Sequence, residues 1–255
     1  MVGQANGHFA LARYLADGSI DTSFGNNGRV TTPIGGSSEA RSVAINQSGS
    51  IYVAGVTSHP LAVVAKYDSN GALDLSWGDS GVSKPHIPEI GSHETSQANA
   101  IAVHMSRVFI AGSYRETFYS EDLSHLSKRS MFYAELTSNG SVSWGLNKID
   151  VFPNLDDGAY QEEIANDLVV DPTNNHLYVV GQATRSTTAP VSNKPVTLFS
   201  QAVVARFHLF VEHNYPALSI DKSYGKEVIF NPDNNELPEG DGQVVGDFLL
   251  VGAIV

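Results

Sequence analysis

Two stretches decide the fold: residues 9–30, FALARYLADGSIDTSFGNNGRV, and residues 42–55, SVAINQSGSIYVAG. In both, short runs rich in valine, isoleucine, tyrosine and phenylalanine alternate with turn sequences that contain glycine, asparagine and serine. Such runs, bounded by such turns, are typical of β-strands. No stretch of the chain keeps a helical period over about eleven residues. The sequence therefore predicts an all-β protein.

Both stretches recur along the chain, which makes it a repeat protein. The strand-like run that closes on a glycine is found at 50–55, 107–112, 176–181 and 248–252, and its glycines are 57, 69 and 71 residues apart. The Asp-x-Ser-aromatic-Gly motif recurs in complete or eroded form, and its residues are Asp21, Phe24, Gly25, Asp74, Trp77, Gly78, Trp144, Asp221, Tyr224 and Gly225. We predict one domain, residues 1–255, with repeats at about 2–55, 56–112, 113–181 and 182–252.

Four strands in a unit of about 60 residues match the blade of a β-propeller better than the shorter repeat of a solenoid. We predict four blades of four antiparallel strands. Three blades are expected at 40–87, 98–152 and 164–230. The fourth is expected to combine N-terminal strands from 8–33 with C-terminal strands from 243–253. The alternative is an open fragment of a larger ring, in which Val2 and Gly3 end a further strand.

The two stretches resemble the bacterial delta-sixty repeat, a family of β-propeller repeats of unknown function. The resemblance is close over residues 8–85, continues to about 181 and is poor after 211. It implies a propeller, and it implies a surface or secreted bacterial protein, outside the cytoplasm. It implies no catalytic residues, because the motif that the family shares is one of turns and packing.

Composition excludes several classes of protein. The formal charge of -12 leaves no basic field for nucleic acid or for an anionic membrane surface. No apolar run approaches the length of a membrane-spanning helix. The absence of cysteine excludes disulfides, thiol nucleophiles and thiolate metal sites. The motifs of zinc proteases, serine hydrolases and phosphate-binding loops are also absent.

The long segments between predicted strands, on one face of the ring, are where binding residues are expected. Five segments form this face: 86–97, 113–130, 153–163, 182–199 and 231–242. The candidate ligand-binding residues in them are Asp156, Asp157, Tyr160, Glu162, Glu163, Glu89, His93 and Glu94. Carboxylates in this number attract divalent cations, and calcium at Asp156 and Asp157 is the one candidate cofactor. A carboxylate pair for glycoside cleavage and an ordinary solvated loop are the alternatives.

In the Asp-x-Ser-aromatic-Gly motif, the structural interpretation is that the aspartate caps a turn, the aromatic ring packs between blades and the glycine takes a backbone angle that other residues resist. The functional alternative is a set of sugar-stacking rings at Trp77, Trp144 and Tyr224. We therefore expect a non-enzymatic binding module for a protein or glycan. A carbohydrate-active hydrolase or lyase, or a lectin, at an acidic propeller mouth is the alternative, and a purely structural spacer is the third.

Overall fold

The computed structural model describes residues 1–59, 61–85, 95–118, 126–142, 147–149, 160–188, 195–209, 218–220 and 248–252. These residues form strands and turns only, which confirms the all-β prediction. Within these ranges there is no helix that is long and apolar enough to cross a membrane.

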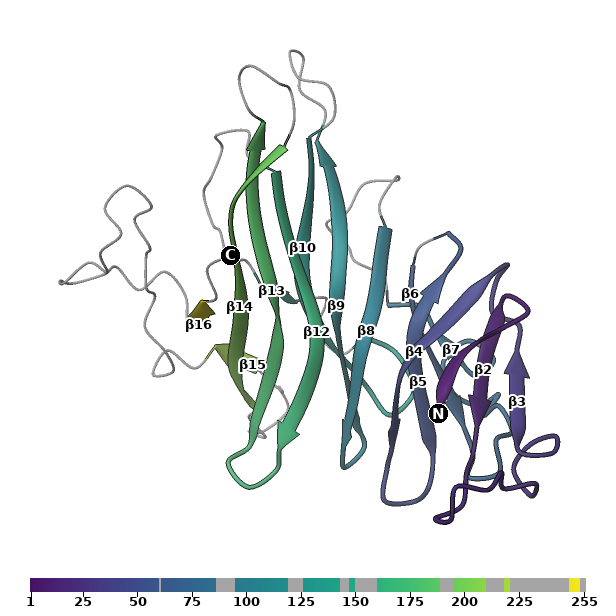
Figure 1. Cartoon of the computed structure of the whole chain (residues 1–255). Coiled ribbons are helices and arrows are strands. Elements are labelled where there is room, and N and C mark those ends of the chain that lie inside the picture. Colours follow the sequence, from purple (N-terminus) through teal and green to yellow (C-terminus); the bar gives the residue numbers. More distant parts are fainter. Residues whose placement is uncertain are drawn as a thin grey trace.

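The strands form four successive units, which Figure 1 shows side by side from N to C terminus. The first unit is β1 (Val2–Ala5), β2 (His8–Ala12) and β3 (Arg29–Thr32). The second is β4 (Ser38–Ile45), β5 (Ile51–Thr57), β6 (Ala62–Tyr67) and β7 (Val82–Ser83). The third is β8 (Thr95–His104), β9 (Arg107–Phe118), β10 (Leu126–Leu136) and β11 (Asn147–Ile149). The fourth is β12 (Tyr160–Asp171), β13 (His176–Thr188) and β14 (Pro195–Leu209), with β15 (Leu218–Ile220) and β16 (Phe248–Gly252) both paired to β14.

Within each unit the strands follow one another in antiparallel order, as in a propeller blade. A single parallel pair, Arg129 on β10 with Glu162 on β12, links the third and fourth units into one nine-stranded sheet. The chain is thus an array of blade-like sheets.

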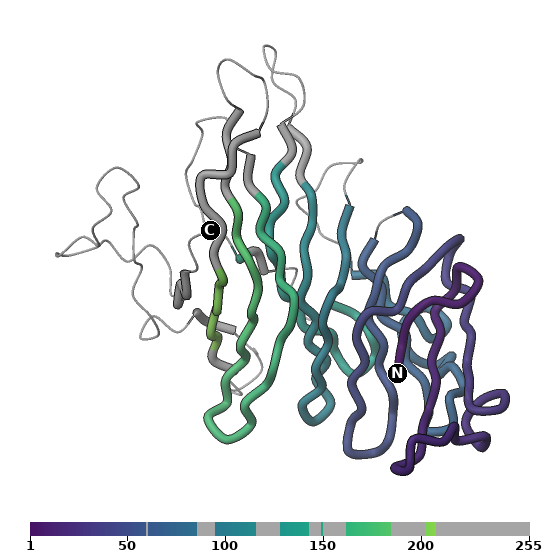
Figure 2. The backbone as a smooth tube through the Cα atoms, viewed as in Figure 1, coloured from purple at the N-terminus to yellow at the C-terminus, as the bar shows by residue number. Residues whose placement is uncertain are grey.

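The predicted sharing of one blade by the two chain ends is wrong. The C-terminal strand β16 pairs with β14 and not with the N-terminal strands. The position beside β2, which the prediction gave to the C-terminal strand, is occupied by β1. In that pair Gly3 is opposite Ala10, as Gly55 is opposite Val63 in the second unit. The register explains this outcome, because Gly3 in β1 has the position that Gly55 has in β5. Figure 2 shows the purple β1–β3 region and the green β12–β14 region at opposite ends of the array.

The hydrophobic core is divided among the contacts between neighbouring units. Successive side chains of a strand point to opposite faces, so each internal unit packs against two neighbours. In the second unit, Val53 packs toward the first unit and Tyr52 toward the third. A further cluster joins the third and fourth units, where the rings of Tyr133 and Phe207 lie 4.3 Å apart.

The aromatic-glycine motif joins one unit to the next. Phe24 and Trp77 are buried. Each ring packs against a turn glycine of the following unit, Phe24 against Gly71 and Trp77 against Gly140, and leaves no room for a side chain there. The motif glycine completes the joint, because Gly25 N donates to Asn70 O and Gly78 N to Asn139 O, both at 2.9 Å. We call this contact the aromatic-glycine joint.

A bulge recurs in the first strand of each of the last three units. The ladder skips one residue at Arg41 in β4, Asn99 in β8 and Asn166 in β12. The bulged strand turns a backbone carbonyl toward the facing glycine, so that a Cβ on Gly112 would lie 1.9 Å from Gln97 O. This close approach explains why the repeated strand run ends in glycine.

Candidate functional site: the arm face

Two long hairpins rise from the third and fourth units (Figure 1). The first pairs β9 with β10 as far as Phe118 and Leu126, and the second pairs β13 with β14 as far as Thr188 and Pro195. In the second unit the equivalent pairing of β5 with β6 ends at Val56 and Ala62. We call the two extensions the arms and the side of the molecule that bears them the arm face. Much of the predicted irregular segments 113–130 and 182–199 is therefore paired strand, which corrects that expectation.

An ionic cluster ties the two units together at the base of the arms. Arg115 on β9 and Arg129 on β10 lie directly opposite each other in the ladder, and like charges in that arrangement repel. Glu162 on β12 relieves the repulsion, because its Oε1 is 3.7 Å from Arg115 Nη2 and 3.8 Å from Arg129 Nη1. One carboxylate of the fourth unit is thus shared by two guanidinium groups of the third.

A line of polar side chains continues from one unit to the next along the bulges. Arg41 Nη1 donates to Gln97 Oε1 at 2.8 Å and to Asn99 Oδ1 at 2.7 Å. Asn99 Nδ2 in turn donates to Ala165 O at 2.8 Å. All three bulges lie near the middle of their strands. The line of polar contacts therefore links three successive units.

The structure brings together few of the predicted ligand-binding residues. Asp156, Asp157, Glu89, His93 and Glu94 lie outside the described residues. Tyr160 is the first residue of β12, opposite Ser186. Glu162 belongs to the ionic cluster, where its arginine neighbours disfavour a divalent cation. Glu163, which points to the other side of the strand, is fully buried. In the parts of the chain that the structure describes, no three His, Asp or Glu residues are grouped to hold a metal ion.

Sequence reasoning missed Arg41, Asn99, Arg115 and Arg129. Two signals pointed toward the arms, at whose base Arg115 and Arg129 lie. The glycine spacing grows from 57 to 69 and 71 residues in the units that carry arms. The run from Ser113 also continues the strand without any glycine, proline or asparagine to end it.

The motif aspartates hold turns and ion pairs. Asp74 Oδ1 accepts from Ser76 N at 3.1 Å and from Ser76 Oγ at 2.5 Å, while its Oδ2 lies 2.7 Å from Lys66 Nζ. Hydrogen bonds from Lys66 and Ser76 lower the pKa of Asp74 to about 2. The pKa of Asp21 is likewise lowered, chiefly by the hydrogen bonds from Ser23. Carboxyls of lowered pKa stay ionised and are poor general acids.

The motif rings that the structure describes offer no sugar-stacking face, because Phe24 and Trp77 are both buried. Trp144, Asp221, Tyr224 and Gly225 lie outside the described residues.

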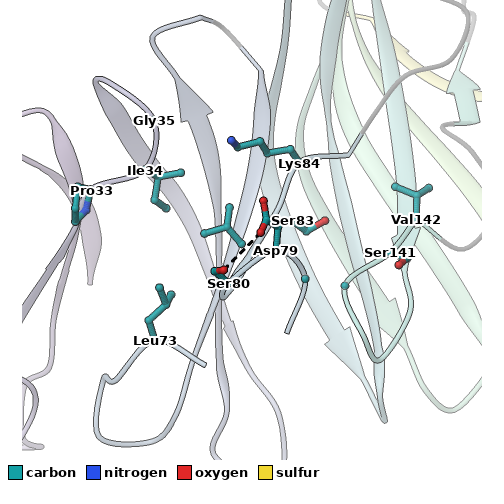
Figure 3. Close-up of a pocket in the computed structure, with 13 residues that line it drawn as sticks. Pro33, Ile34, Gly35, Leu73, Asp79, Ser80, Ser83, Lys84, Ser141 and Val142 are labelled. Carbon is teal, nitrogen blue, oxygen red and sulfur yellow. Dashed lines mark hydrogen bonds between the residues drawn. The ribbon is translucent and has the colours of Figure 1, made fainter. Parts of the chain in front are cut away.

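A cavity of about 730 Å³ lies beside the second aromatic-glycine joint, between residues 33–35, 73–84 and 140–142. Figure 3 shows its only charged side chains, Asp79 and Lys84, on the same segment. Asp79 Oδ1 accepts from Ser80 Oγ at 3.5 Å. A single carboxylate does not supply the acid and base pair that glycoside cleavage requires.

One family match bears on the architecture. Residues 2–24 match the family described as "Domain of unknown function (DUF5122) beta-propeller". No curated protein matches the chain. Among solved structures, the periplasmic gluconolactonase PpgL of Pseudomonas aeruginosa is similar over 91% of this chain and 72% of that chain, with 12% identity and a TM-score of 0.37. The match of residues 2–24 and the strand order within the units support a β-propeller repeat architecture.

Proposed function

We propose that this chain is a non-enzymatic binding module that contacts a partner protein through the arm face. The paired arms, held together at their base by Glu162 between Arg115 and Arg129, carry the proposal. Extended hairpins on a rigid sheet scaffold present backbone and side chains at a distance from the core, where they add little to folding. Such elements fit recognition of another macromolecule.

Several observations favour a protein partner over a carbohydrate. The described aromatic residues of the repeated motif are buried rather than presented to solvent. The charged groups at the arm base have both signs, with Arg115, Arg129 and Arg41 near Glu162 and Glu39. Mixed charge is complementary to the polar rim of a protein interface.

The finer predictions remain part of this proposal. They are membership of the delta-sixty repeat family, a location outside the cytoplasm or at the cell surface, and calcium at Asp156 and Asp157. The first rests on the resemblance of residues 9–30 and 42–55.

Removal of one arm tests the proposed function. Residues 115–129 are replaced by Asn-Gly, which joins Tyr114 to Ser130 by a two-residue hairpin turn at an existing ladder pair. Wild type and the shortened chain are used to capture proteins from lysate of the source cells and are applied to a glycan array. We expect a protein that wild type captures and the shortened chain does not.

Two controls separate binding from folding. Thermal unfolding shows whether the shortened chain keeps a cooperative transition, and Glu162→Gln removes the carboxylate while the arms remain. Capture of the same protein in equal amounts by wild type and the shortened chain would reject the proposal. Binding only on the glycan array would also reject it.

A further inference from the structure

The three contacts between units use equivalent positions, so the faces at the two ends of the array can be identified. In each internal unit, one face packs against the preceding unit and the other against the following unit. Among the described residues, the first unit packs its following face, with Phe9 and Leu11, against the second unit. The fourth unit, within the same described part of the chain, packs its preceding face, with Leu177 and Phe207, against the third. One face at each end is therefore of the same kind as the faces that pack inside the molecule.

At the first end, the positions that are buried in other units are open. Tyr14 forms the same isolated bridge as Tyr67 and Leu136, yet its side chain is 47% exposed, whereas theirs are fully buried. Gly18 corresponds to Gly71 and Gly140 and has the same left-handed backbone, with a φ of 84°. No atom lies within 4 Å of its Cβ position, where the other two glycines meet Phe24 or Trp77.

At the last end, apolar side chains point away from the third unit. Val204 is opposite Val180 in the ladder. Val64 and Tyr133 hold the equivalent position in the second and third units, where both are buried in a core between units. Val204 is only half-buried. Ala202 is exposed. Val169 occupies the position of Ala44 and Ala102, which pack against those cores, and it is 58% exposed.

We propose that the preceding face of the first unit, around Tyr14 and Gly18, docks on the following face of the fourth unit, around Val169 and Val204, of a second copy of this chain. The partner is indicated by the repeat itself, because each end presents one half of a contact that the molecule already makes three times. A contact between two different faces of identical chains is head-to-tail, and it closes into a ring or extends into a filament according to its angle.

A second copy fits better than closure within one chain. The described C-terminal strand β16 is paired to β14, and the two ends of the array lie on opposite sides of the molecule (Figure 2). The docking face is separate from the arms, so association through it leaves the arm face open.

Introduction of a negative charge at each end tests the proposal on the full chain. Tyr14→Glu alters the first end and Val169→Glu alters the last, each at an exposed position, and Met105→Glu is the control on a turn that is 75% exposed. Molar mass is measured by light scattering and sedimentation up to about 1 mM protein, where even weak association is seen. We expect wild type and Met105→Glu to associate with rising concentration, and each end variant to associate at least about tenfold more weakly.

A mixture of the two end variants gives a sharper result. Each keeps one intact end, so an equimolar mixture should form two-chain particles and nothing larger, although each variant alone remains single. Wild type that stays single at the highest concentration would overturn the proposal. So would end variants that associate as wild type does. A concentration-independent fall in the melting temperature of Tyr14→Glu would show instead that this face is covered within one chain.

Discussion

The second and third units have the same strand order, the same bulge and the same registers, but they differ on the arm face. β5 continues two residues past Gly55 to Thr57, whereas β9 continues six residues past Gly112 to Phe118. They also differ in their ion pairs. The second unit pairs Lys66 with Asp74, and the third, whose eroded motif has no aspartate, pairs Glu135 with Arg107.

This difference shows which positions the repeat constrains. Where a residue contacts the neighbouring unit, both units carry side chains that are buried in a core cluster, such as Val64 and Tyr133 or Ala62 and Met131. At the position of Lys66 and Glu135, the sign of the charge is reversed together with its partner. The arm face has no such constraint, and there the units diverge most.

The largest expected effect comes from disrupting a feature that the two units share, the close approach of a bulge carbonyl to the facing glycine. Gly112→Ala would place a Cβ 1.9 Å from Gln97 O, and Gly55→Ala a Cβ 2.0 Å from Glu39 O. Since both contacts are with backbone, we expect each to lower the free energy of unfolding by about 4 kcal/mol. Urea titration measures the loss.

Gly3→Ala is the matched control for these substitutions. Gly3 occupies the same register in the first unit, but no atom lies within 4 Å of its Cβ position. Its effect should stay within about 1 kcal/mol. An equal loss at Gly3 and Gly112 would show that the bulge carbonyl is not the cause.

The second effect concerns the ion pair specific to the third unit. Arg107 Nε and Nη2 donate to the two oxygens of Glu135 at 2.7 and 2.8 Å, and the Glu135 side chain is 7% exposed. Arg107→Met leaves that carboxylate buried and unpaired, so we expect a loss of about 3 kcal/mol in urea unfolding. The double variant Arg107→Met with Glu135→Leu removes both charges and should be more stable than the single variant. A double variant as unstable as the single one would contradict this account.

Some of these features could be predicted from the sequence and others could not. The all-β fold and the repeat followed from the recurring runs and turns, because both are local signals. The aromatic-glycine joint followed in outline from its recurrence, since a ring repeated once per unit is best placed between units. The bulges did not follow, because nothing in Ala40–Arg41–Ser42 or Ala98–Asn99–Ala100 marks the skipped residue until the partner strand is known.

Ring closure and the candidate site were beyond a local reading for the same reason. The C-terminal run resembles the strand that closes a blade, but pairing partners are set by the whole chain, and β16 lies against β14. Glu162 was singled out for its charge. Its neighbours Arg115 and Arg129 come from two other strands, and only the three-dimensional register brings them within 4 Å.

The third prediction concerns the pH dependence of the stability that the Lys66–Asp74 pair contributes to the second unit. The folded pKa of Asp74 is lowered to about 2, below the value of about 3.9 in an unfolded chain. A depressed folded pKa stabilises the protein above the unfolded pKa, and that contribution is lost as pH falls from about 4 toward 2. Asp74→Asn should therefore lower stability at pH 7 by about 1 kcal/mol and reduce the loss between pH 5 and pH 3 in urea titrations. An unchanged acid profile would show that the pair with Lys66 does not stabilise the second unit.

The smallest expected effect is at the aromatic-glycine joint, where the first unit has Phe24 and the second has Trp77. Trp77 packs edge-on to Tyr52, with ring centres 5.9 Å apart, but its indole nitrogen finds no hydrogen-bond partner among the described residues. Trp77→Phe loses apolar contact and also removes a buried, unpaired N–H group, so the two effects oppose each other. We expect thermal unfolding to report a change within about 1 kcal/mol.

The reverse change, Phe24→Trp, adds both bulk and an N–H to a buried ring beside Gly71 and should be clearly more destabilising. Equal losses in the two directions would mean that the two joints are matched to their own rings rather than being one contact with a better and a worse occupant.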